Sequence, residues 1–322
     1  MKATAIAHTN IALIKYWGKR DKTLILPANS SLSMTLDQFY TETTVEWSDA
    51  FMTDQFTLNG SRIEDTKVTR FLTILRQQFG MTEKAHVTST NHVPTAAGLA
   101  SSASAFAALA LAASKAAGRE DDDETLSRLA RLGSGSASRS IFGDFALWQK
   151  GTDDTGIDSY AYPVVAPTEL DLAMVVAVVD AGPKKIDSRL GMQSTVETSP
   201  YFEAWTATAE KDLLTIQDAF KANDFKIIGE TVERNALSMH ATTMAATPPF
   251  SYLKPASFAI METVHALREN GIEAYFTMDA GPNVKVLCLT KDEQQVQTAL
   301  ASHTDQVYIC HPGPKARVIA HD

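Results

Sequence analysis

The sequence predicts a protein of mixed helices and strands, built in two parts that join near residues 180–190. Strand and helix patterns alternate through the first half, whereas long helical patterns predominate from about residue 188 to residue 269. A strand–turn–strand pattern follows them. The 322 residues are 44% hydrophobic and 21% charged, which suffices for one large or two medium domains.

The first half contains predicted strands, a hairpin and two helices. Residues 42–47 (ETTVEW) and 55–63 (QFTLNGSRI) alternate apolar and polar side chains, and Asn-Gly in the second marks a hairpin turn. Residues 67–80 place apolar side chains on one helical face and end on glycine. A strand at AHVTSTN leads into the alanine-rich segment, and EDDDETLSRLARLG is a helix with acids in its first turn.

The second half begins after LDLAMVVAVVD, a nearly continuous apolar strand. Three helices are expected at PYFEAWTATAEKDLLTIQDAF, DFKIIGETVERNALSMHATTM and PASFAIMETVHALREN. EAYFTMDAGPNVKVLCLT follows as strand, turn and strand; a helix, the short strand VYICHP and a polar tail complete the chain.

Charge and composition exclude several classes of protein. The net charge is -9 and no Lys/Arg run is present, which disfavours a nucleic-acid or membrane-surface binder but leaves room for a small anionic ligand. Two distant cysteines form neither a disulfide framework nor a metal site, so we expect a reducing compartment. The N-terminus lacks a signal-like apolar core and the apolar runs fall short of the roughly 18 residues of a membrane helix. We expect a cytoplasmic protein.

The segment PTAAGLASSASA has the features of a phosphate-binding helix start. Pro94 follows a strand, Gly98 permits close backbone approach, and Ser101, Ser102 and Ser104 open a helix. Backbone N–H groups at a helix start favour an anion, and serine hydroxyls add donors or a magnesium ligand. The alternative is a close-packed alanine helix with no ligand. A P-loop is excluded because GxxxxGK[ST] is absent.

The segment GSGSASRSIFGDF is a second candidate anion-binding segment rich in glycine and serine. Its Gly/Ser turn can form a nest of N–H groups, and Arg139 offers a planar, bidentate partner for carboxylate or phosphate. A flexible loop with a solvated arginine is the more ordinary interpretation.

Two further segments are cationic, and one carries a carboxylate. IALIKYWGKRD places Lys15 and Lys19 around two aromatic residues, although an amphipathic strand with solvated lysines has the same pattern. AGPKKIDSRLGM adds basic residues after a strand. Asp279 ends an apolar strand, where a turn-capping role and a catalytic role are equally open. Together these segments suit a phosphorylated substrate and a nucleotide.

PTAAGLASSASA resembles the phosphate-binding motif of the GHMP kinase superfamily, and NIALIKYWGKRD, LPANSSLSMTLD, GSGSASRSIFGDF and MDAGPNVKVL resemble the bacterial mevalonate diphosphate decarboxylases within it. The resemblance spans residue 6 to about residue 288. It implies an α+β, two-lobed GHMP kinase fold, with an N-terminal lobe like ribosomal protein S5 domain 2 over residues 1–185 and a ferredoxin-like lobe over residues 186–322. It also implies a homodimer.

The resemblance further implies ATP- and Mg²⁺-dependent decarboxylation of mevalonate diphosphate to isopentenyl diphosphate. Asp279 is then the base, or the group that orients the 3-hydroxyl; Arg139 holds the substrate carboxylate, and Lys15 neutralises the transferring phosphate. The implied substrate site comprises Tyr16, Trp17, Gly18, Lys19, Lys67, Ser134, Gly135, Ser136, Ala137, Ser138, Arg139, Ser188 and Arg189. Lys67 and Arg189 stand where eukaryotic relatives carry other residues.

The implied nucleotide site comprises Pro94, Ala97, Gly98, Leu99, Ala100, Ser101, Ser102, Ser104 and Lys184, with Ser102 as the magnesium ligand. Three alternatives stay open: a mevalonate 3-kinase, a phosphomevalonate decarboxylase, and a phospholigand-binding protein without activity. Relatives of the first kind lack the Lys/Arg/Asp set, and the third has no need of Asp279 beside basic groups.

Overall fold

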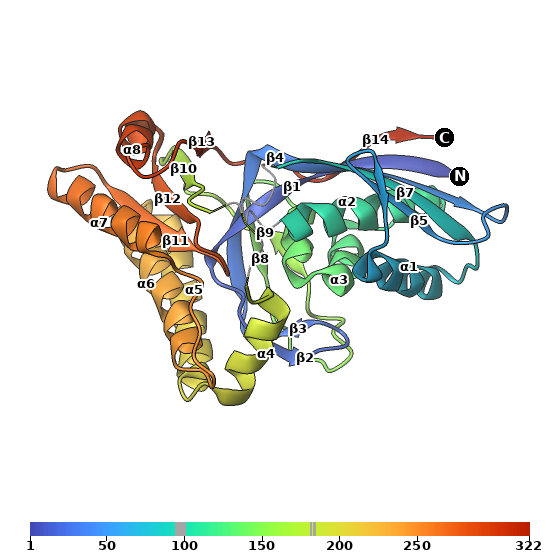
Figure 1. Cartoon of the computed structure of the whole chain (residues 1–322), viewed down its shortest axis with the longest axis horizontal. Coiled ribbons are helices and arrows are strands. Elements are labelled where there is room, and N and C mark those ends of the chain that lie inside the picture. Colours follow the sequence, from blue (N-terminus) through green and yellow to red (C-terminus); the bar gives the residue numbers. More distant parts are fainter. Residues whose placement is uncertain (94–100, 181, 183–184) are drawn as a thin grey trace.

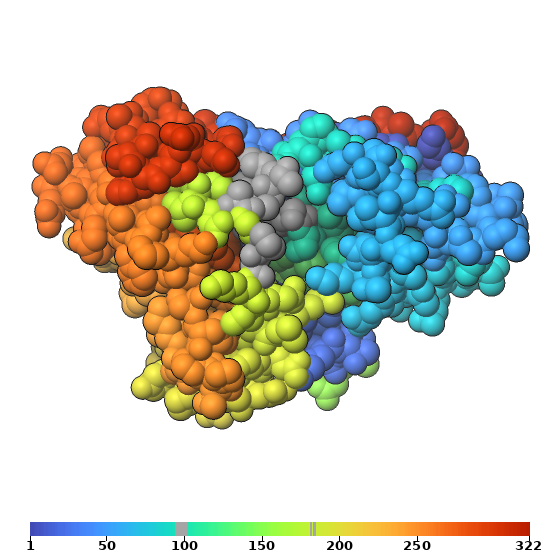
Figure 2. Space-filling model, in the orientation of Figure 1, coloured from blue at the N-terminus to red at the C-terminus, as the bar shows by residue number. Residues whose placement is uncertain are grey.

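A computed structural model describes residues 1–93, 101–180, 182 and 185–322 of the chain. Its two lobes lie side by side, each with its own sheet and helices (Figures 1 and 2). Among these residues, no helix combines the length and the apolar character needed to cross a bilayer.

The sheet of the first lobe is mostly antiparallel and has the order β14-β1-β4-β7-β5-β6, with β8 and β9 continuing from β4. Its strands are β1 (Lys2–Ile14), β4 (Ser31–Ser48), β5 (Gln55–Leu58), β6 (Ser61–Ile63), β7 (Lys84–His92), β8 (Phe145–Trp148), β9 (Ala161–Pro163) and β14 (Arg317–His321). A separate ribbon pairs β2 (Lys19–Asp21) with β3 (Leu26–Pro27). Only β5 and β7 run parallel within the described sheet.

The predicted turn residues explain two local features. Asn59 and Gly60 join β5 to β6 with positive φ angles of 50° and 80°, as a two-residue hairpin loop requires. Helix α1 (Thr66–Phe79) ends where Gly80 adopts a left-handed conformation with φ of 66°. Both predictions are confirmed.

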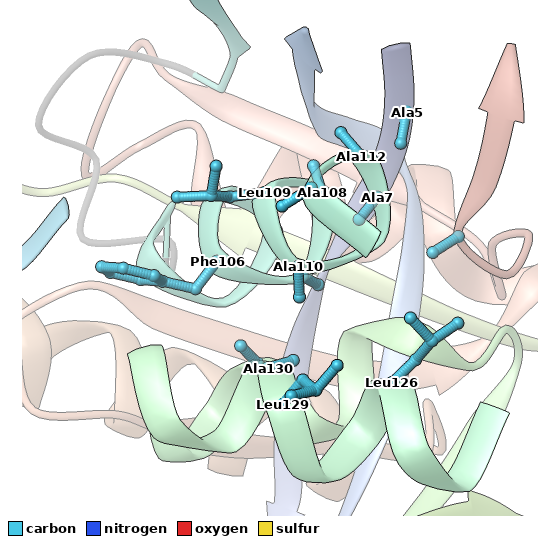
Figure 3. Close-up of a cluster of buried hydrophobic side chains, with 14 of the residues drawn as sticks. Ala5, Ala7, Phe106, Ala108, Leu109, Ala110, Ala112, Leu126, Leu129 and Ala130 are labelled. Carbon is cyan, nitrogen blue, oxygen red and sulfur yellow. The ribbon is translucent and has the colours of Figure 1, made fainter. Parts of the chain in front are cut away.

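Helix α2 (Ser101–Ala116) lies between the sheet and helix α3 (Asp123–Gly133), as Figure 3 shows. The alanines of β1 and α2 are small, so the helix approaches the sheet closely; Ala7 and Ala108 belong to the same buried cluster. Leu126 and Leu129 of α3 point toward α2 from the other side. The alanines in the described part of this segment are therefore core.

The second lobe has a four-stranded antiparallel sheet of order β11-β12-β10-β13. Its elements are β10 (Leu172–Ala177), α4 (Ser188–Thr198), α5 (Phe202–Ala222), α6 (Phe225–Met244), α7 (Pro255–Glu269), β11 (Ala274–Met278), β12 (Val284–Leu289), α8 (Glu293–Leu300) and β13 (Val307–Cys310). Numbered 1 to 4 along the chain, the strands follow one another across the sheet in the order 4-1-3-2, the ferredoxin-like arrangement. The predicted two-lobed α+β fold is confirmed.

The two sheets do not divide the chain at one residue. β10 precedes the predicted boundary at residues 185/186 but belongs to the second sheet, and β14 at the C-terminus pairs with β1 of the first. The tail that we expected only to be polar contains this edge strand, residues 317–321. The boundary itself stays a prediction.

Candidate active site

A cleft of about 420 Å³ lies between the two lobes. Its walls come from the end of β1, the short 3₁₀ helix η1 (Gly135–Ile141), the start of α2, the start of α4 and the turn after β11. Both lobes therefore contribute side chains to the cleft.

Lys15 follows β1 and is held in place through its main chain. Its backbone N–H donates to Asn235 Oδ1 at 2.8 Å, and its carbonyl accepts from Asn29 Nδ2 at 2.7 Å. Asn235 lies on α6 and donates to the buried Asp212 of α5 at 2.9 Å. The position of Lys15 thus depends on helices that are about 200 residues away in the sequence.

The side chain of Lys15 is buried and reaches Asp279, which follows β11. Lys15 Nζ lies 2.8 Å from Asp279 Oδ1, and Lys285 Nζ of β12 lies 3.0 Å from Oδ2. Burial alone would raise the pKa of Asp279, but the two ammonium groups outweigh it and hold the pKa far below its usual range. Asp279 is therefore an ionised carboxylate with 22% of its side chain exposed.

The same cluster shifts the pKa values of its basic side chains. Burial lowers the pKa of Lys15 to about 8, and repulsion from Lys285 and Arg139 acts in the same direction, against the attraction of Asp279. Burial also lowers the pKa of the neighbouring His240 to about 4, so this ring is neutral. Three cations thus surround one carboxylate, which favours an anionic ligand.

Arg139 lies in η1 and is buried, so its interpretation as a solvated loop residue is wrong. Nη1 donates to Ser31 Oγ at 2.5 Å, while Nε and Nη2 donate to Asn10 Oδ1 at 3.3 and 3.2 Å. Burial lowers its pKa to about 10, which leaves it charged near neutral pH. Within the described chain this guanidinium forms no ion pair closer than 4.0 Å, so its charge is available to an anion in the cleft.

Aromatic packing explains the glycines around Tyr16. A Cβ on Gly135 would lie 2.8 Å from the Tyr16 ring, and a Cβ on Gly18, whose φ is 96°, would lie 2.4 Å from the Phe202 ring. The Tyr16 hydroxyl and the Trp17 indole nitrogen are buried donors without a protein partner in the described regions. Both residues line the cleft, so a polyanionic ligand would satisfy these donors.

Basic side chains gather around the start of α4. Burial, with repulsion from Arg189 and Arg70, lowers the pKa of Lys19 to about 8. Lys67 Nζ lies 3.6 Å from a carboxylate oxygen of Asp187, the residue that caps α4. Arg189 Nη2 donates to the carbonyl of Gly133 at 3.1 Å. Lys19, Lys67, Ser188 and Arg189 all line the cleft, as predicted from the sequence.

Hydroxyl groups line the cleft where α2 and η1 begin. Ser134 Oγ lies 3.4 Å from Ser102 Oγ and 3.3 Å from Ser136 Oγ. Magnesium usually takes one or two protein oxygens and completes its shell with water and substrate phosphates, so the Ser102 hydroxyl fits such a site. The described residues hold no cluster of three His, Cys, Asp or Glu side chains that could bind a metal on its own.

Four of the predicted residues that the structure describes lie away from the cleft lining: Gly18, Ser104, Ala137 and Ser138. Ser104 is buried, and its hydroxyl lies 2.8 Å from Thr41 Oγ1 of β4. Ala137 is buried in the first core, and Ser138 donates to the carbonyl of Gly135 at 2.8 Å. These contacts correspond to packing of α2 and η1.

Gly18 is outside the lining because its role is conformational: its positive φ and the nearby Phe202 ring leave no room for a side chain. Pro94, Ala97, Gly98, Leu99, Ala100 and Lys184 lie outside the described residues, as does the side chain of Ser101.

Sequence reasoning missed three residues that hold the predicted ones. Asn10 and Asn235 fix Arg139 and Lys15, and Lys285 pairs with Asp279. Asn10 stands inside a quoted motif, and Lys285 interrupts an apolar strand, which was an available signal. Asn235 lies in an ordinary helical pattern and carried no signal.

Comparison with known proteins gives one consistent result. Residues 7–161 match the model of the diphosphomevalonate decarboxylase-like N-terminal domain, and residues 174–311 match that of the mevalonate 5-diphosphate decarboxylase C-terminal domain. The diphosphomevalonate decarboxylase of Candida albicans is 38% identical and the alignment covers 99% of this chain and 91% of that protein. The human one is also 38% identical, with 89% and 76% covered.

Solved structures agree with the sequence matches. The mevalonate diphosphate decarboxylase of Staphylococcus aureus is 46% identical, has a TM-score of 0.95 and covers 99% of this chain and 98% of its own. A second relative, 49% identical with a TM-score of 0.95 and 99% coverage of each chain, was solved in complex with MVAPP, AMPPCP and magnesium.

Proposed function

Because this chain belongs to the diphosphomevalonate decarboxylase family of the GHMP superfamily, we propose specific roles for the residues of its cleft. The enzyme catalyses the ATP-dependent decarboxylation of mevalonate diphosphate. The observation that supports the assignment of roles best is the Asp279 carboxylate between Lys15 and Lys285, in the cleft that Arg139 also lines.

The chemistry needs two steps. The 3-hydroxyl of the substrate attacks the γ-phosphorus of ATP, ADP departs, and the poor leaving group becomes a phosphate ester. That phosphate then departs with the C–O electron pair, and the C–C bond to the carboxylate supplies the electrons of the new double bond, so carbon dioxide is released. Magnesium, when bound with ATP, neutralises charge on its phosphates.

We assign Asp279 to orientation of the 3-hydroxyl. A carboxylate whose pKa is held so low by two ammonium groups is a weak proton acceptor. Each carboxylate oxygen has a second lone pair, so Asp279 can accept a hydrogen bond from the hydroxyl while both lysines stay paired. Phosphoryl transfer has a loose transition state in which the proton leaves late, so positioning matters more than proton storage.

We assign Lys15 to the charge of the transferring phosphoryl group and Arg139 to the substrate carboxylate. Lys15 Nζ lies 2.8 Å from Asp279 Oδ1, the carboxylate that we assign to the hydroxyl, so its charge would lie beside the site of transfer. Arg139 has only neutral hydrogen-bond partners among the described residues, and its planar group matches a carboxylate. Tyr16, Lys19, Ser188 and Arg189 supply donors for the diphosphate, and Ser102 supplies a ligand for magnesium.

The test of this function measures carbon dioxide and ADP in the same sample, with mevalonate diphosphate and with the monophosphate. We expect equal amounts of both products and a higher kcat/KM for the diphosphate. ADP without carbon dioxide would indicate a 3-kinase, and a preference for the monophosphate would indicate a phosphomevalonate decarboxylase. Absence of both products would leave only a binding protein.

Asp279→Asn tests the orienting carboxylate. Asparagine has a similar size but no charge, so we expect a folded protein that binds ATP and whose turnover falls by at least about 100-fold. Single-turnover product formation, with circular dichroism as the check of folding, measures the effect. A folded variant with turnover near that of the wild type contradicts the role.

We further propose a cytoplasmic homodimer, on the basis of the resemblance and of the two cysteines, both free and buried. Light scattering coupled to gel filtration tests the oligomeric state, and a mass of one chain would contradict a dimer.

A further inference from the structure

Lys285 is a fully buried lysine in the middle of an apolar strand. Its neighbours in β12, Val284 and Val286, belong to the core of the second lobe. Its Nζ lies 3.0 Å from Asp279 Oδ2 and 3.3 Å from the carbonyl of Asn283. Burying an ammonium group costs free energy that a single ion pair seldom recovers, and an aliphatic side chain would avoid this cost. Packing alone therefore does not account for a lysine here.

We propose that Lys285 is a positioning residue for the reaction, which holds the second carboxylate oxygen of Asp279 so that the carboxylate stays ionised and aimed into the cleft. The proposal rests on the role of Asp279 given above. Lys285 does not line the cleft, so it acts through Asp279 and not on the substrate.

The hairpin of the second lobe supports this role geometrically. β11 and β12 pair with Thr277 opposite Lys285, and Asp279 follows two residues after Thr277. The Lys285–Asp279 pair is thus made within one hairpin, whereas Lys15 reaches Asp279 from the other lobe. Oδ1 accepts a hydrogen bond from Lys15 of the opposing lobe, whereas Oδ2 is held by the charge of Lys285 within the hairpin, without an aligned hydrogen bond in the described residues. The carboxylate is therefore attracted from both sides.

The charges around the pair determine what loss of Lys285 does. Asp279 faces Lys15 from the end of β1 and Arg139 from η1, and the neutral His240 of α6 lies beside them. Without the Lys285 charge, the pKa of Asp279 rises because one of its two ion pairs is lost. The pKa of Lys15 also rises, because a repelling cation is removed and the whole attraction of Asp279 remains.

The experiment compares Lys285→Met and Lys285→Arg with Val286→Ala, a control in the same strand and core. Each variant is assayed for kcat, for KM of ATP and of mevalonate diphosphate, and for the pH dependence of kcat/KM; thermal unfolding is measured in parallel. For Lys285→Met we expect kcat to fall at least about tenfold with KM for ATP within about twofold. We expect the alkaline fall of its kcat/KM to become shallower and its midpoint to rise by a few tenths of a pH unit, since Lys19, whose pKa is about 8, still titrates.

Lys285→Arg keeps the charge, so its alkaline midpoint should stay near that of the wild type. Val286→Ala should unfold at a lower temperature with an unchanged pH profile. Lys19 titrates equally in every variant, so the differences report Lys285. A folded Lys285→Met enzyme with wild-type kcat and an unshifted midpoint would overturn the proposal.

If Lys285→Met does not fold, Lys285→Gln decides by the same two readouts. Wild-type enzyme that forms neither ADP nor carbon dioxide would instead contradict the proposed function itself.

Discussion

Arg139 combines a charge, deep burial and hydrogen bonds to neutral partners. Ser31 and Asn10 hold its nitrogen atoms without cancelling its charge, and the ring of Trp148 lies 5.9 Å from its Cζ. A buried arginine without a carboxylate partner is unfavourable in the free protein, and an incoming carboxylate removes that cost. The free energy of substrate binding is thereby directed to the group that departs as carbon dioxide.

Arg139→Lys tests that assignment because lysine keeps the charge and loses the planar, two-pronged contact. We expect carbon dioxide formation to fall at least about tenfold, corresponding to one charge-assisted hydrogen bond, with ATP affinity retained. Single-turnover measurement of ADP and carbon dioxide gives the result. Arg131→Lys is the matched control: Arg131 is also buried but bonds the carbonyls of Leu24 and Gly156, so only stability should fall. Wild-type rates of both products in Arg139→Lys would refute the role.

Lys15 and Lys19 both have pKa values lowered to about 8, mainly by burial. Both must be protonated to attract phosphate, so kcat/KM should be constant below about pH 7 and fall above about pH 8 as protons are lost. Bound polyanion favours the charged lysines, so the fall in kcat should come at higher pH. Lys19→Arg removes one titration, because arginine stays charged, and should make the alkaline fall shallower. An alkaline limb that keeps its slope and midpoint in this variant contradicts the assignment to Lys19.

Residue types were easier to predict than their surroundings. The sequence predicted chemical roles for Lys15, Arg139 and Asp279, which stay predictions, yet it could not tell a buried lysine from a solvated one. Burial of Lys15 depends on Asp279 and on Asn235, which lie far along the chain. Burial by residues so distant in the chain leaves no pattern in the sequence around Lys15.

At the scale of elements, one face of α2 packs against the sheet and another lines the cleft. Ser102 is exposed to the cleft, and Ser104, two residues later and about 200° around the helix, is buried against β4. Alanine-rich composition correctly predicted a helix and its close packing. Composition could not predict which serine lines the cleft, because the serines lie on different faces of the helix, among alanines.

Ser102→Ala and Ser104→Ala separate these two faces. We expect Ser102→Ala to raise KM for MgATP roughly tenfold, with a smaller effect on mevalonate diphosphate, because a donor or metal ligand is lost. Ser104→Ala should leave both KM values unchanged and lower the free energy of unfolding by about 1 kcal/mol, since it removes the bond to Thr41. Steady-state kinetics and urea denaturation measure the pair. A Ser102→Ala enzyme that loses affinity for mevalonate diphosphate alone would move Ser102 out of the nucleotide site.

The elements that escaped prediction include the edge strand β14, the strands β8 and β9, the first part of β4 and helix α4. β14 has mostly exposed side chains and is defined by backbone pairing with β1, so it lacks the alternating apolar face that signals a strand. In the second lobe, strands β10, β11 and β12 and helices α5, α6 and α7 carry strong apolar patterns and were predicted at nearly the observed positions.

At the scale of the whole molecule, the two lobes share one core. Ile11 of β1 and Leu32 of β4 are buried in the same cluster as Met174 of β10 and Ile216 of α5. The chain also returns from β13 to the first lobe, where His311 exchanges backbone and side-chain hydrogen bonds with Asp37. The cleft therefore lies between lobes that are joined by packing, which keeps Lys15 and Asp279 at bonding distance.

Gly313 tests whether this return segment holds the lobes in register. A Cβ at this position would lie 2.5 Å from the carbonyl carbon of Leu36, and Gly313 also bonds Thr35 and Asp144 through its backbone. Gly313→Ala must push β4 and the segment apart, so we expect a loss of roughly 1–3 kcal/mol in the free energy of unfolding and a lower kcat.

Gly271→Ala is the control: a Cβ at this position would meet open space, but the φ of 83° makes a side chain cost about 1 kcal/mol in conformational strain, and activity should persist. Denaturant unfolding, turnover and hydrogen exchange of residues 35–37 provide the comparison. If Gly313→Ala matched the wild type in all three, the close contact between the return segment and β4 would not be what keeps the cleft assembled.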